Sequence, residues 1–589
     1  MSAPAPRDGR DHALVAIAAG VVLVGALWGA GVASALLGGH PVPHGHPLGE
    51  LAAFAHPGDP SAAWHGPVGP APLYWALTAL FLWVIGGLCI LARRMLRQGP
   101  ARAVEDPTRA EGLADRNQVR RFAGHRALLR RADTLRPSLA QPSPPDVGYR
   151  LGHSRGMSCW ASVEDSVLVL GPPRSGKGQS LVIPMILDAP GAVVTTSTRP
   201  DNLTVTLAAR EKLGPVAVFD PEGLAHAPSV TPTLRWSPVR GCESPQRAMV
   251  RAAALVADTG RQGVDNGAFW HQQTLAGVRC LLHAAALDDR GPSDLYRWSH
   301  AAARAKEAVA ILARDPLATP GWDQALDAIV SADPRTRDSV WAMVANTFAP
   351  LADPAVLEAV SPRGQDAFDP GRFLTEGGTL YLLGTASGSS ATANLVAALV
   401  EDVVASARRM AAISTGARLD PPVGLVLDEA ANYALPSLPG LMAEGGGSGI
   451  TTVAVLQSLA QARDRWSRDA AQAIWDAAIV KVVLGGSANA DDLTDISRLI
   501  GERDAREWSE TVGAGEGARS VSTSIHRRPI LEPSAIRRIP MGHGLLLLRA
   551  APPIMMTLSP WTARRDADQL VAARRSFEAA MAVPARAAS

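Results

Sequence analysis

The chain has 589 residues, of which 47% are hydrophobic and 19% are charged, and this length is enough for two or three domains. Its formal net charge of +2 is close to balance, so bulk charge identifies no class of partner. None of the four cysteines has a C-x-x-C neighbour, which argues against a zinc site or a disulfide framework and favours inert thiols. They are Cys89, Cys159, Cys242 and Cys280.

Two long apolar stretches lie near the N-terminus. Residues 13–37 carry no charge and exceed the roughly 20 residues that cross a bilayer, and residues 73–91 form the second stretch. A signal peptide is the alternative for the first, but its length and the second stretch favour two transmembrane helices. Arginines flank the pair, whereas the loop 38–72 has neither Lys nor Arg. The positive-inside rule therefore predicts an external loop, a cytoplasmic N-terminus (residues 1–12) and a cytoplasmic C-terminus, in the cytoplasmic membrane.

The external loop and the segment after the second span have distinctive compositions. The loop carries several histidines, but its Pro and Gly content favours a flexible loop over a metal site. Residues 92–147 are rich in arginine, and residues 117–133 are predicted to form one helix with a basic face. That face could contact DNA or anionic lipid, although a solvated helix is the simpler interpretation. The Pro- and Ser-rich residues 139–147 are predicted to be a linker.

The most informative motif follows the apolar run 166–170, which leads into Gly171, Pro172, Pro173, Arg174, Ser175, Gly176, Lys177, Gly178 and Gln179. A strand, a G-x-x-x-x-G-K loop and a helix together form a cradle in which backbone N–H groups bind phosphate. We predict that this loop binds nucleotide, with Lys177 on the terminal phosphates. Gly178 stands where Ser or Thr usually holds Mg²⁺, so that ligand stays unassigned, with Ser180 as a candidate. A glycine-rich turn that binds nothing is the alternative.

A second motif is the apolar run 423–427, which ends in Asp428 and Glu429. A buried parallel strand has this composition, and its carboxyl end delivers side chains to the crevice in which α/β sheets bind ligands. We predict that Asp428 holds Mg²⁺, directly or through water, and that Glu429 polarises the attacking water. Taken alone, the motif is equally compatible with an ordinary strand end.

The soluble part of the chain is predicted to be an α/β domain with an insertion. Strands alternate with helical stretches in residues 148–243 and again in residues 351–561, which is typical of a parallel sheet. Between them, residues 244–350 show only helical periodicity, so they are predicted to be an all-helical insertion. The arginine-rich tail 562–589 is predicted to begin as a helix. The predicted strands are residues 191–196, 215–219, 380–383, 423–427, 451–456, 479–484 and 545–548.

Together, these residues resemble the TraG/TraD family of type IV coupling proteins, the membrane ATPases of conjugative DNA transfer, and most closely an actinobacterial-type branch with the TraM-recognition region of TraD. The resemblance covers most of the chain. It rests on the loop 171–178 and on Thr196–Asp201, Phe219–Pro221, Asp428–Ala430 and Gly445–Ile450 leading to Gln457.

The resemblance implies a RecA-like P-loop NTPase fold with a parallel central sheet, and ATP and Mg²⁺ as cofactors. It also implies a homo-hexamer that couples ATP hydrolysis to delivery of single-stranded DNA, with its relaxase, to the secretion channel. Gln457 would sense the γ-phosphate, with a buried polar strand end as the alternative. Gly178 fits this family, whose secretion branch commonly has Gly-Lys-Gly at the end of the loop.

One departure from the family keeps other functions open. Members often carry an arginine just before the strand that ends at Gln457, where this chain has Gly446, Gly447 and Ser448. An arginine finger can raise the rate by orders of magnitude. Two alternatives are therefore a nucleotide-gated substrate receptor with little hydrolysis and an FtsK-like double-stranded DNA translocase, although few residues after Trp561 are left for a DNA-reading domain. Substitute fingers, none of them assigned, are Arg463, Arg465, Arg527, Arg528, Arg537 and Arg538.

Overall fold

The computed structural model describes residues 9–44, 49–64, 66–96, 106–225, 233–257, 267–384, 392–512 and 519–582. The chain divides into two compact units, Met1–Val104 and Glu105–Ser589.

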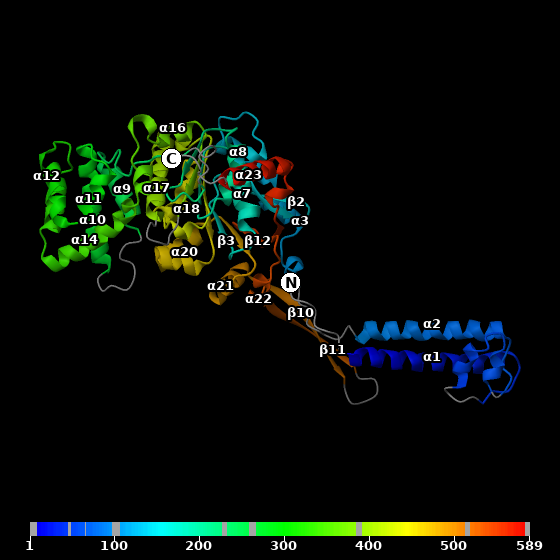
Figure 1. Cartoon of the computed structure of the whole chain (residues 1–589). Helices are drawn as coiled ribbons and strands as arrows, with labels where there is room; N and C mark the ends of the chain where they lie inside the picture. Colours follow the sequence, from blue (N-terminus) through cyan, green and yellow to red (C-terminus); the bar gives the residue numbers. More distant parts are fainter. Residues whose placement is uncertain are drawn as a thin grey trace. The chain divides into compact units, whose positions relative to one another are not determined.

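The first unit is a pair of long helices, α1 (Gly9–Leu37) and α2 (Ala71–Leu96), which pack along each other (Figure 1). Between them lie two short 3₁₀ helices, Gly49–Phe54 and Pro60–Ala63. The indole of Trp64 packs so closely on α1 that a Cβ at Gly31 would lie 2.0 Å from its ring.

Both long helices contain an 18-residue window that is apolar enough to cross a membrane, Gly20–Leu37 and Ala71–Leu88. Large apolar side chains such as Trp28, Leu80 and Trp83 are exposed on them, as expected of surfaces that face lipid. Among the residues that the structure describes, no group of three or more His, Cys, Asp or Glu side chains is placed to hold a metal ion, and two of the loop histidines, His46 and His65, lie outside those residues.

The second unit is built on one large mixed sheet. In the described residues the sheet has 11 strands in the order β2-β1-β13-β12-β9-β3-β8-β7-β4-β6-β5. The strands from β9 to β5 pair in parallel, and those from β2 to β9 pair antiparallel. Their bounds are β1 Gly148–Ser154, β2 Met157–Ser162, β3 Val167–Leu170, β4 Val193–Ser197, β5 Val216–Phe219, β6 Thr379–Leu383, β7 Val423–Leu427, β8 Ile450–Leu456, β9 Val480–Leu484, β12 His543–Leu548 and β13 Ile554–Thr557.

The parallel strands form where the sequence has short continuous apolar runs, because helices cover both faces of the sheet there. All eight predicted strands are confirmed, namely the run 166–170, which forms β3, and the seven other predicted runs. Alternate residues enter opposite cores: Leu425 packs on the side of α17, and Val426 packs on the side of α7. The antiparallel strands β1, β2 and β13 were not predicted, because β1 and β2 mix polar, Gly and apolar residues without a continuous run.

Figure 1 shows the helices that cover the two faces of the sheet. One layer contains α17, α18, α19 and α20, and the other contains α7, α8 and α23. Helices α16, α21 and α22 also contribute buried residues to the core of the first layer. The bounds of all these helices are α7 Ile183–Leu187, α8 Asp201–Arg210, α16 Pro370–Thr375, α17 Ala393–Ile413, α18 Leu438–Glu444, α19 Leu459–Trp466, α20 Arg468–Ala477, α21 Ala490–Ile500, α22 Pro533–Arg537 and α23 Ala567–Ala582.

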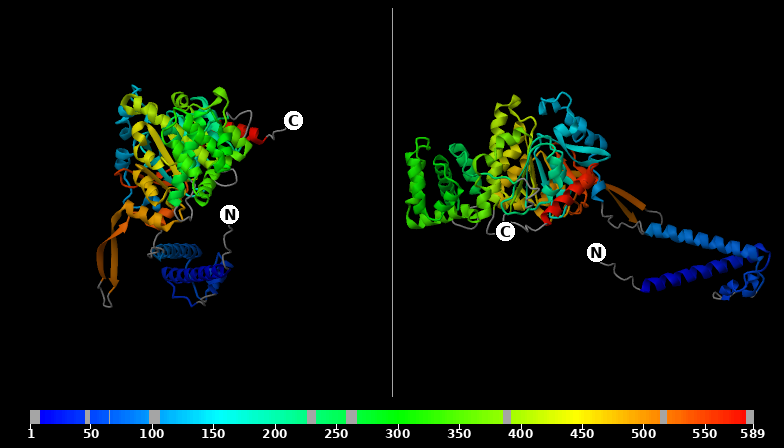
Figure 2. Two further views of the ribbon diagram at one scale, coloured as in Figure 1. Left: turned by 90° about the vertical axis from the view of Figure 1, so that its left-hand side faces the viewer. Right: turned by 45° about the horizontal axis from the view of Figure 1, so that its top comes forward.

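The segment between β5 and β6 is helical, and no strand occurs in its described residues from 245 to 375. Its helices form a separate group beside the sheet (Figures 1 and 2). Helix α9 connects this group to the sheet-bearing part, because it packs on both α10 and α17. Trp298 and Leu326 are fully buried within the group. The helices are α9 Pro245–Leu255, α10 Gly267–Leu287, α11 Pro292–Ser299, α12 Lys306–Arg314, α13 Trp322–Val330, α14 Pro334–Phe348 and α15 Pro354–Ala359.

The predicted single helix 117–133 is wrong, because the chain there forms three short helices. They are α3 Arg116–Phe122, α4 His125–Leu129 and α5 Ala132–Leu135. Gly124 sits at the break, where a Cβ would lie 2.7 Å from the carbonyl oxygen of Arg120. The following segment contains α6 (Pro144–Val147) and is tied to the body of the unit, since Arg136 forms an ion pair with Asp420.

A two-stranded hairpin was also missed. Strands β10 (Glu502–Val512) and β11 (Arg519–Pro529) form their own antiparallel sheet and extend away from the large sheet (Figure 2). The cysteine interpretation holds for Cys159, Cys242 and Cys280, which are buried free thiols; only the backbone of Cys89, in α2, is described. Burial raises the pKa of Cys242 to about 11, which makes its thiol unreactive.

Candidate nucleotide-binding site

The glycine-rich loop begins where β3 ends, at Leu170, and leads into a helical turn, Gly178–Val182, that continues as α7. Two glycines suit the geometry of the loop. A Cβ at Gly171 would lie 2.7 Å from the Ser175 hydroxyl, and Gly176 has a φ of +86°, which L side chains rarely adopt. The Lys177 ammonium donates a hydrogen bond to the Gly171 carbonyl at 3.0 Å, so it lies across the loop. This is the conformation of a phosphate cradle.

The loop forms one wall of a cavity of about 680 Å³ at the carboxyl ends of β3, β4, β7 and β8. That volume is in the range of small-molecule sites, and the position is the usual ligand crevice of an α/β sheet. The predicted residues Lys177, Asp428, Glu429 and Gln457 all line this cavity. The full lining is Pro173, Arg174, Gly176, Lys177, Gly178, Gln179, Ile183, Ser197, Thr198, Arg199, Asp201, Asn202, Val205, Asp428, Glu429, Gln457, Trp561, Thr562 and Arg574.

Three loop residues, Gly171, Pro172 and Ser175, lie behind this lining. Ser180, the candidate Mg²⁺ ligand, is buried in the turn after the loop, where its backbone N–H donates to the Gly176 carbonyl at 3.0 Å. It does not line the cavity.

Asp428 is a half-buried acid that lines the cavity. Burial raises its pKa to about 6, the nearby Lys177 charge opposes that rise, and the Glu429 charge adds to it. The carboxylate therefore lacks full compensation from protein groups, and a hard divalent cation would supply it. The residues present thus fit Mg²⁺ at Asp428.

Glu429 is held in an unusual backbone conformation. Its φ of +50° is left-handed, which costs a non-glycine residue on the order of 1–3 kcal/mol. Two side chains donate to the same carboxylate oxygen: the Thr198 hydroxyl at 2.5 Å and the Asn432 amide at 3.0 Å. The Thr196 hydroxyl also donates to the Asp428 carbonyl at 2.9 Å. The segment after β4 thereby helps to fix the position of the Glu429 carboxylate.

An arginine that the sequence analysis missed also lines the cavity. None of the six proposed substitute fingers does, and Arg463 is instead paired with Asp492 at 2.9 Å. The cavity contains Arg574 of α23, whose Nε donates to Glu578 at 2.7 Å. The only signal in the sequence was the arginine content of the tail.

Helix α23 is anchored beside the glycine-rich loop. Leu570 packs with Ile183 and Trp561 in one apolar cluster. Just before the helix, Arg564 pairs with Asp188 at 2.6 Å. The tail therefore returns to the first helix after the loop, and this return places Arg574 in the cavity.

Two segments of the chain match known family models. Residues 122–287 match the model described as "Type IV secretory system Conjugative DNA transfer", and residues 422–541 match "TraM recognition site of TraD and TraG". Each match contains part of the cavity, since the first includes the glycine-rich loop and the second includes Asp428, Glu429 and Gln457. A comparison with curated proteins gave no match.

Solved structures of the conjugative coupling protein TrwB share the fold. The plasmid coupling protein TrwB in complex with ADP and Mg²⁺ is 19% identical, with a TM-score of 0.53 over 72% of this chain and 91% of that one. The unbound monoclinic form of TrwBdeltaN70 is 18% identical, with a TM-score of 0.52 over 73% of this chain and 92% of that one. The complex of TrwB with the non-hydrolysable GTP analogue GDPNP gives the same values as the unbound form.

Proposed function

Since the two family matches and the shared fold identify the chain as a TraG/TraD-like type IV coupling protein, we propose that it is a membrane-anchored ATPase that delivers single-stranded DNA with its relaxase to a secretion channel. The observation that carries the ATPase proposal is the convergence of Lys177, Asp428, Glu429 and Gln457 on one cavity. The TrwB complex with ADP and Mg²⁺ supports the same two ligands here.

The residues divide the work of phosphoryl transfer. The loop N–H groups and Lys177 bind the phosphates, once Lys177 exchanges the Gly171 carbonyl for phosphate oxygen. Asp428 holds Mg²⁺, which when bound neutralises charge on the phosphates. Glu429, oriented by Thr198 and Asn432, polarises the attacking water. Gln457 directly follows β8, the strand next to the one that leads to Asp428, and would respond to the terminal phosphate.

We assign the role of the arginine finger to Arg574, because this chain has no arginine just before β8. An arginine from the same chain can stabilise phosphoryl transfer as one from a partner can. Arg574 suits this role because α23 is packed on α8 and its anchors lie beside the loop. The exposed neighbour Arg575 does not line the cavity and provides a matched control.

The proposal includes the assembly. The two apolar helices span the cytoplasmic membrane with both termini in the cytoplasm, and six copies form a ring in which neighbouring subunits complete the motor. The apolar windows of α1 and α2 support the spans, and the absence of Lys and Arg between them supports the topology.

ATP turnover by the full chain in detergent micelles tests this function, with and without single-stranded DNA and beside Lys177→Ala and Glu429→Gln. Stimulation by single-stranded DNA that both substitutions abolish is the expected result. ATP binding without turnover, even with DNA present, would favour the nucleotide-gated receptor. Stimulation by double-stranded DNA alone would favour an FtsK-like translocase.

A further inference from the structure

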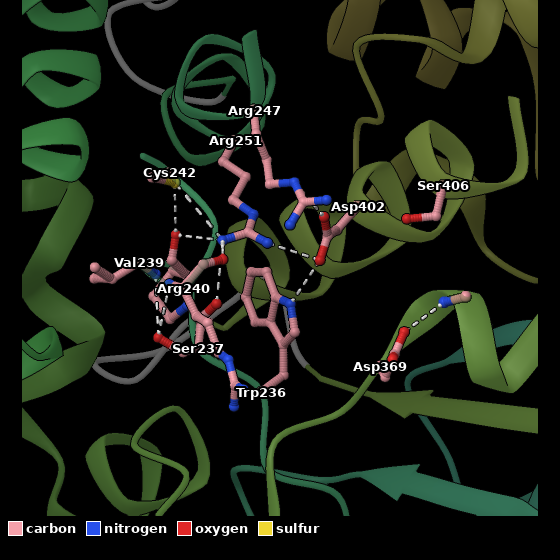
Figure 3. A network of polar contacts seen from close by, with 12 residues as sticks. Trp236, Ser237, Val239, Arg240, Cys242, Arg247, Arg251, Asp369, Asp402 and Ser406 are labelled. Carbon is pink, nitrogen blue, oxygen red and sulfur yellow. Dashed lines mark hydrogen bonds and ion pairs between the residues drawn. The ribbon is translucent and has the colours of Figure 1, made fainter. Parts of the chain in front are cut away.

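A second cavity, of about 410 Å³, lies where the helical group meets the sheet-bearing part of the second unit (Figure 3). Its walls come from α9, from the C-terminal half of α17, from the loop residues 236–240 and from residues 367–371, which lead into the first turn of α16. It shares no lining residue with the nucleotide cavity. We call it the arginine pocket, because Arg240, Arg247, Arg251 and Arg409 line it.

One arginine of the pocket is structural. Arg251 is buried, and its guanidinium donates to Asp402 at 2.8 Å and to the carbonyls of Arg240 and Pro238 at 2.6 and 3.0 Å. The Trp236 indole donates to the same Asp402 oxygen at 3.2 Å. Figure 3 shows these groups converging on Asp402 from different segments. The charges of Arg251 and Asp402 therefore neutralise each other.

The other arginines have little compensation. The Arg247 Nε lies 3.9 Å from the second oxygen of Asp402, beyond hydrogen-bond distance, and that buried oxygen has no hydrogen-bond partner among the described residues. Arg409 is exposed, and its hydrogen bond within the part of the chain that the structure describes goes to the neutral Ser406 hydroxyl, at 2.8 Å. Partial burial lowers the pKa of Arg409, the positive charge of Arg247 lowers it further, and the negative charge of Asp402 opposes this shift in part, so Arg247 and Arg409 repel each other.

The remaining acid of the pocket is already engaged. Asp369 accepts hydrogen bonds from the first backbone N–H groups of α16, at Gly371 and Arg372. The lining thus contains four arginines and two carboxylates, and the exposed Arg240 donates to the Gly364 carbonyl at 3.2 Å. The pocket carries a surplus of two positive charges, and a bound anion with two closely spaced negative charges would relieve the repulsion.

We propose that the arginine pocket binds the phosphate backbone of single-stranded DNA, with Arg247 and Arg409 on consecutive phosphates. Planar guanidinium forks suit phosphate oxygens, and the Ser406 hydroxyl adds a further donor. Phe368 and Met410 line the same pocket and offer apolar surface to a sugar or base. This inference rests on the proposed function, which supplies DNA as the substrate.

Fluorescence anisotropy with a labelled single-stranded oligonucleotide tests the proposal on the full chain in detergent micelles, over a series of salt concentrations. The test variant is Arg247→Ala/Arg409→Ala. The control is Arg408→Ala, which removes a neighbouring exposed charge of α17 that does not line the pocket. Thermal unfolding of each variant shows whether the fold is kept, and Arg247→Lys/Arg409→Lys serves as a second test that retains the charge but not the fork.

The double alanine variant is expected to bind DNA on the order of tenfold more weakly at 0.1 M salt, with a log–log salt slope lower by about 1.4, because each lost single-strand phosphate contact removes about 0.7. Arg408→Ala is expected to match the wild-type chain. The lysine variant is expected to keep the salt slope and lose part of the affinity.

Unchanged DNA affinity and slope in a folded double alanine variant would overturn the proposal. It would equally be overturned if the variant lost binding of an acidic peptide while DNA binding stayed intact. Basal ATP turnover separates the two ideas. If the wild-type chain has no ATP turnover but its DNA affinity still depends on Arg247 and Arg409, the motor function is refuted and the DNA site is supported. If DNA stimulates turnover but the double alanine variant binds DNA as the wild-type chain does, the motor function is supported and the DNA site is refuted.

Discussion

The nucleotide cavity and the arginine pocket both present positive charge, but they are built differently. The first takes its N–H donors from the residues other than proline in one contiguous segment, 171–179, whose local turn fixes their directions. The second joins side chains from distant segments, such as Arg251 and Asp402, 151 positions apart. Their acids differ as well. The charge of Lys177 only partly offsets the rise in the pKa of Asp428, whereas Asp402 forms a close ion pair with Arg251. A site made from backbone is thus specified locally, whereas a site made from guanidinium groups depends on how helices pack.

The largest expected effect is a loss of ATP turnover when the acid of the nucleotide cavity is changed. Glu429→Gln keeps the side-chain shape but removes the base, so turnover is expected to fall by about 10²–10⁴-fold while ATP binding persists. Single-turnover kinetics and a fluorescent-nucleotide titration measure the two properties. The Arg247→Ala/Arg409→Ala variant should keep basal turnover, and a comparable loss in that variant would erase the distinction between the cavities.

The next effect concerns stability, in the arginine pocket alone. Arg251→Met leaves Asp402 buried without its partner, so the free energy of unfolding is expected to fall by about 3–5 kcal/mol. Chemical denaturation measures this change. Arg251→Met/Asp402→Leu should recover much of it, because the uncompensated charge is removed. If Arg251→Met alone were as stable as the wild-type chain, the ion pair between Arg251 of α9 and Asp402 of α17 would not contribute to stability.

A smaller effect is expected from the tail. Arg574→Ala removes a cation from the nucleotide cavity, so kcat should fall on the order of 10-fold or more with little change in nucleotide affinity. Arg575→Ala, on the same helix, should leave kcat unchanged. If the two variants had the same kcat, Arg574 would not be the arginine finger, and an arginine of a neighbouring subunit would be the next candidate.

The smallest effect is a pH dependence of the nucleotide cavity. A proton and Mg²⁺ compete for Asp428, whose pKa is raised to about 6, so Mg²⁺-dependent nucleotide affinity should fall about tenfold per pH unit below pH 6 and level off above pH 7. The raised pKa also means that the metal-free protein loses stability as pH rises from about 4 to 6. Calorimetric titration from pH 5 to pH 8 with and without Mg²⁺ checks the first effect. An equal dependence without Mg²⁺ would exclude Asp428 as its source.

Contiguous signals in the sequence sufficed for much of the fold. The apolar runs of β3, β7 and β8 predicted buried parallel strands, and the helical period predicted helices such as α13, Trp322–Val330. Strands β1 and β2 lacked such a run, and the break at Gly124 depended on one close backbone contact. These elements were therefore missed or misjudged.

The sequence by itself determined the phosphate loop, the acids at the end of β7 and the apolar helices, because each depends on residues adjacent in the chain or on a regular period. Only the tertiary structure decided that α23 returns to the nucleotide cavity with Arg574, and that Arg247 and Arg409 share a pocket. The physical reason is that guanidinium groups act through space. Which of the 57 basic residues come together depends on the packing of α9 on α17 and of α23 on α8, and no local pattern encodes that packing.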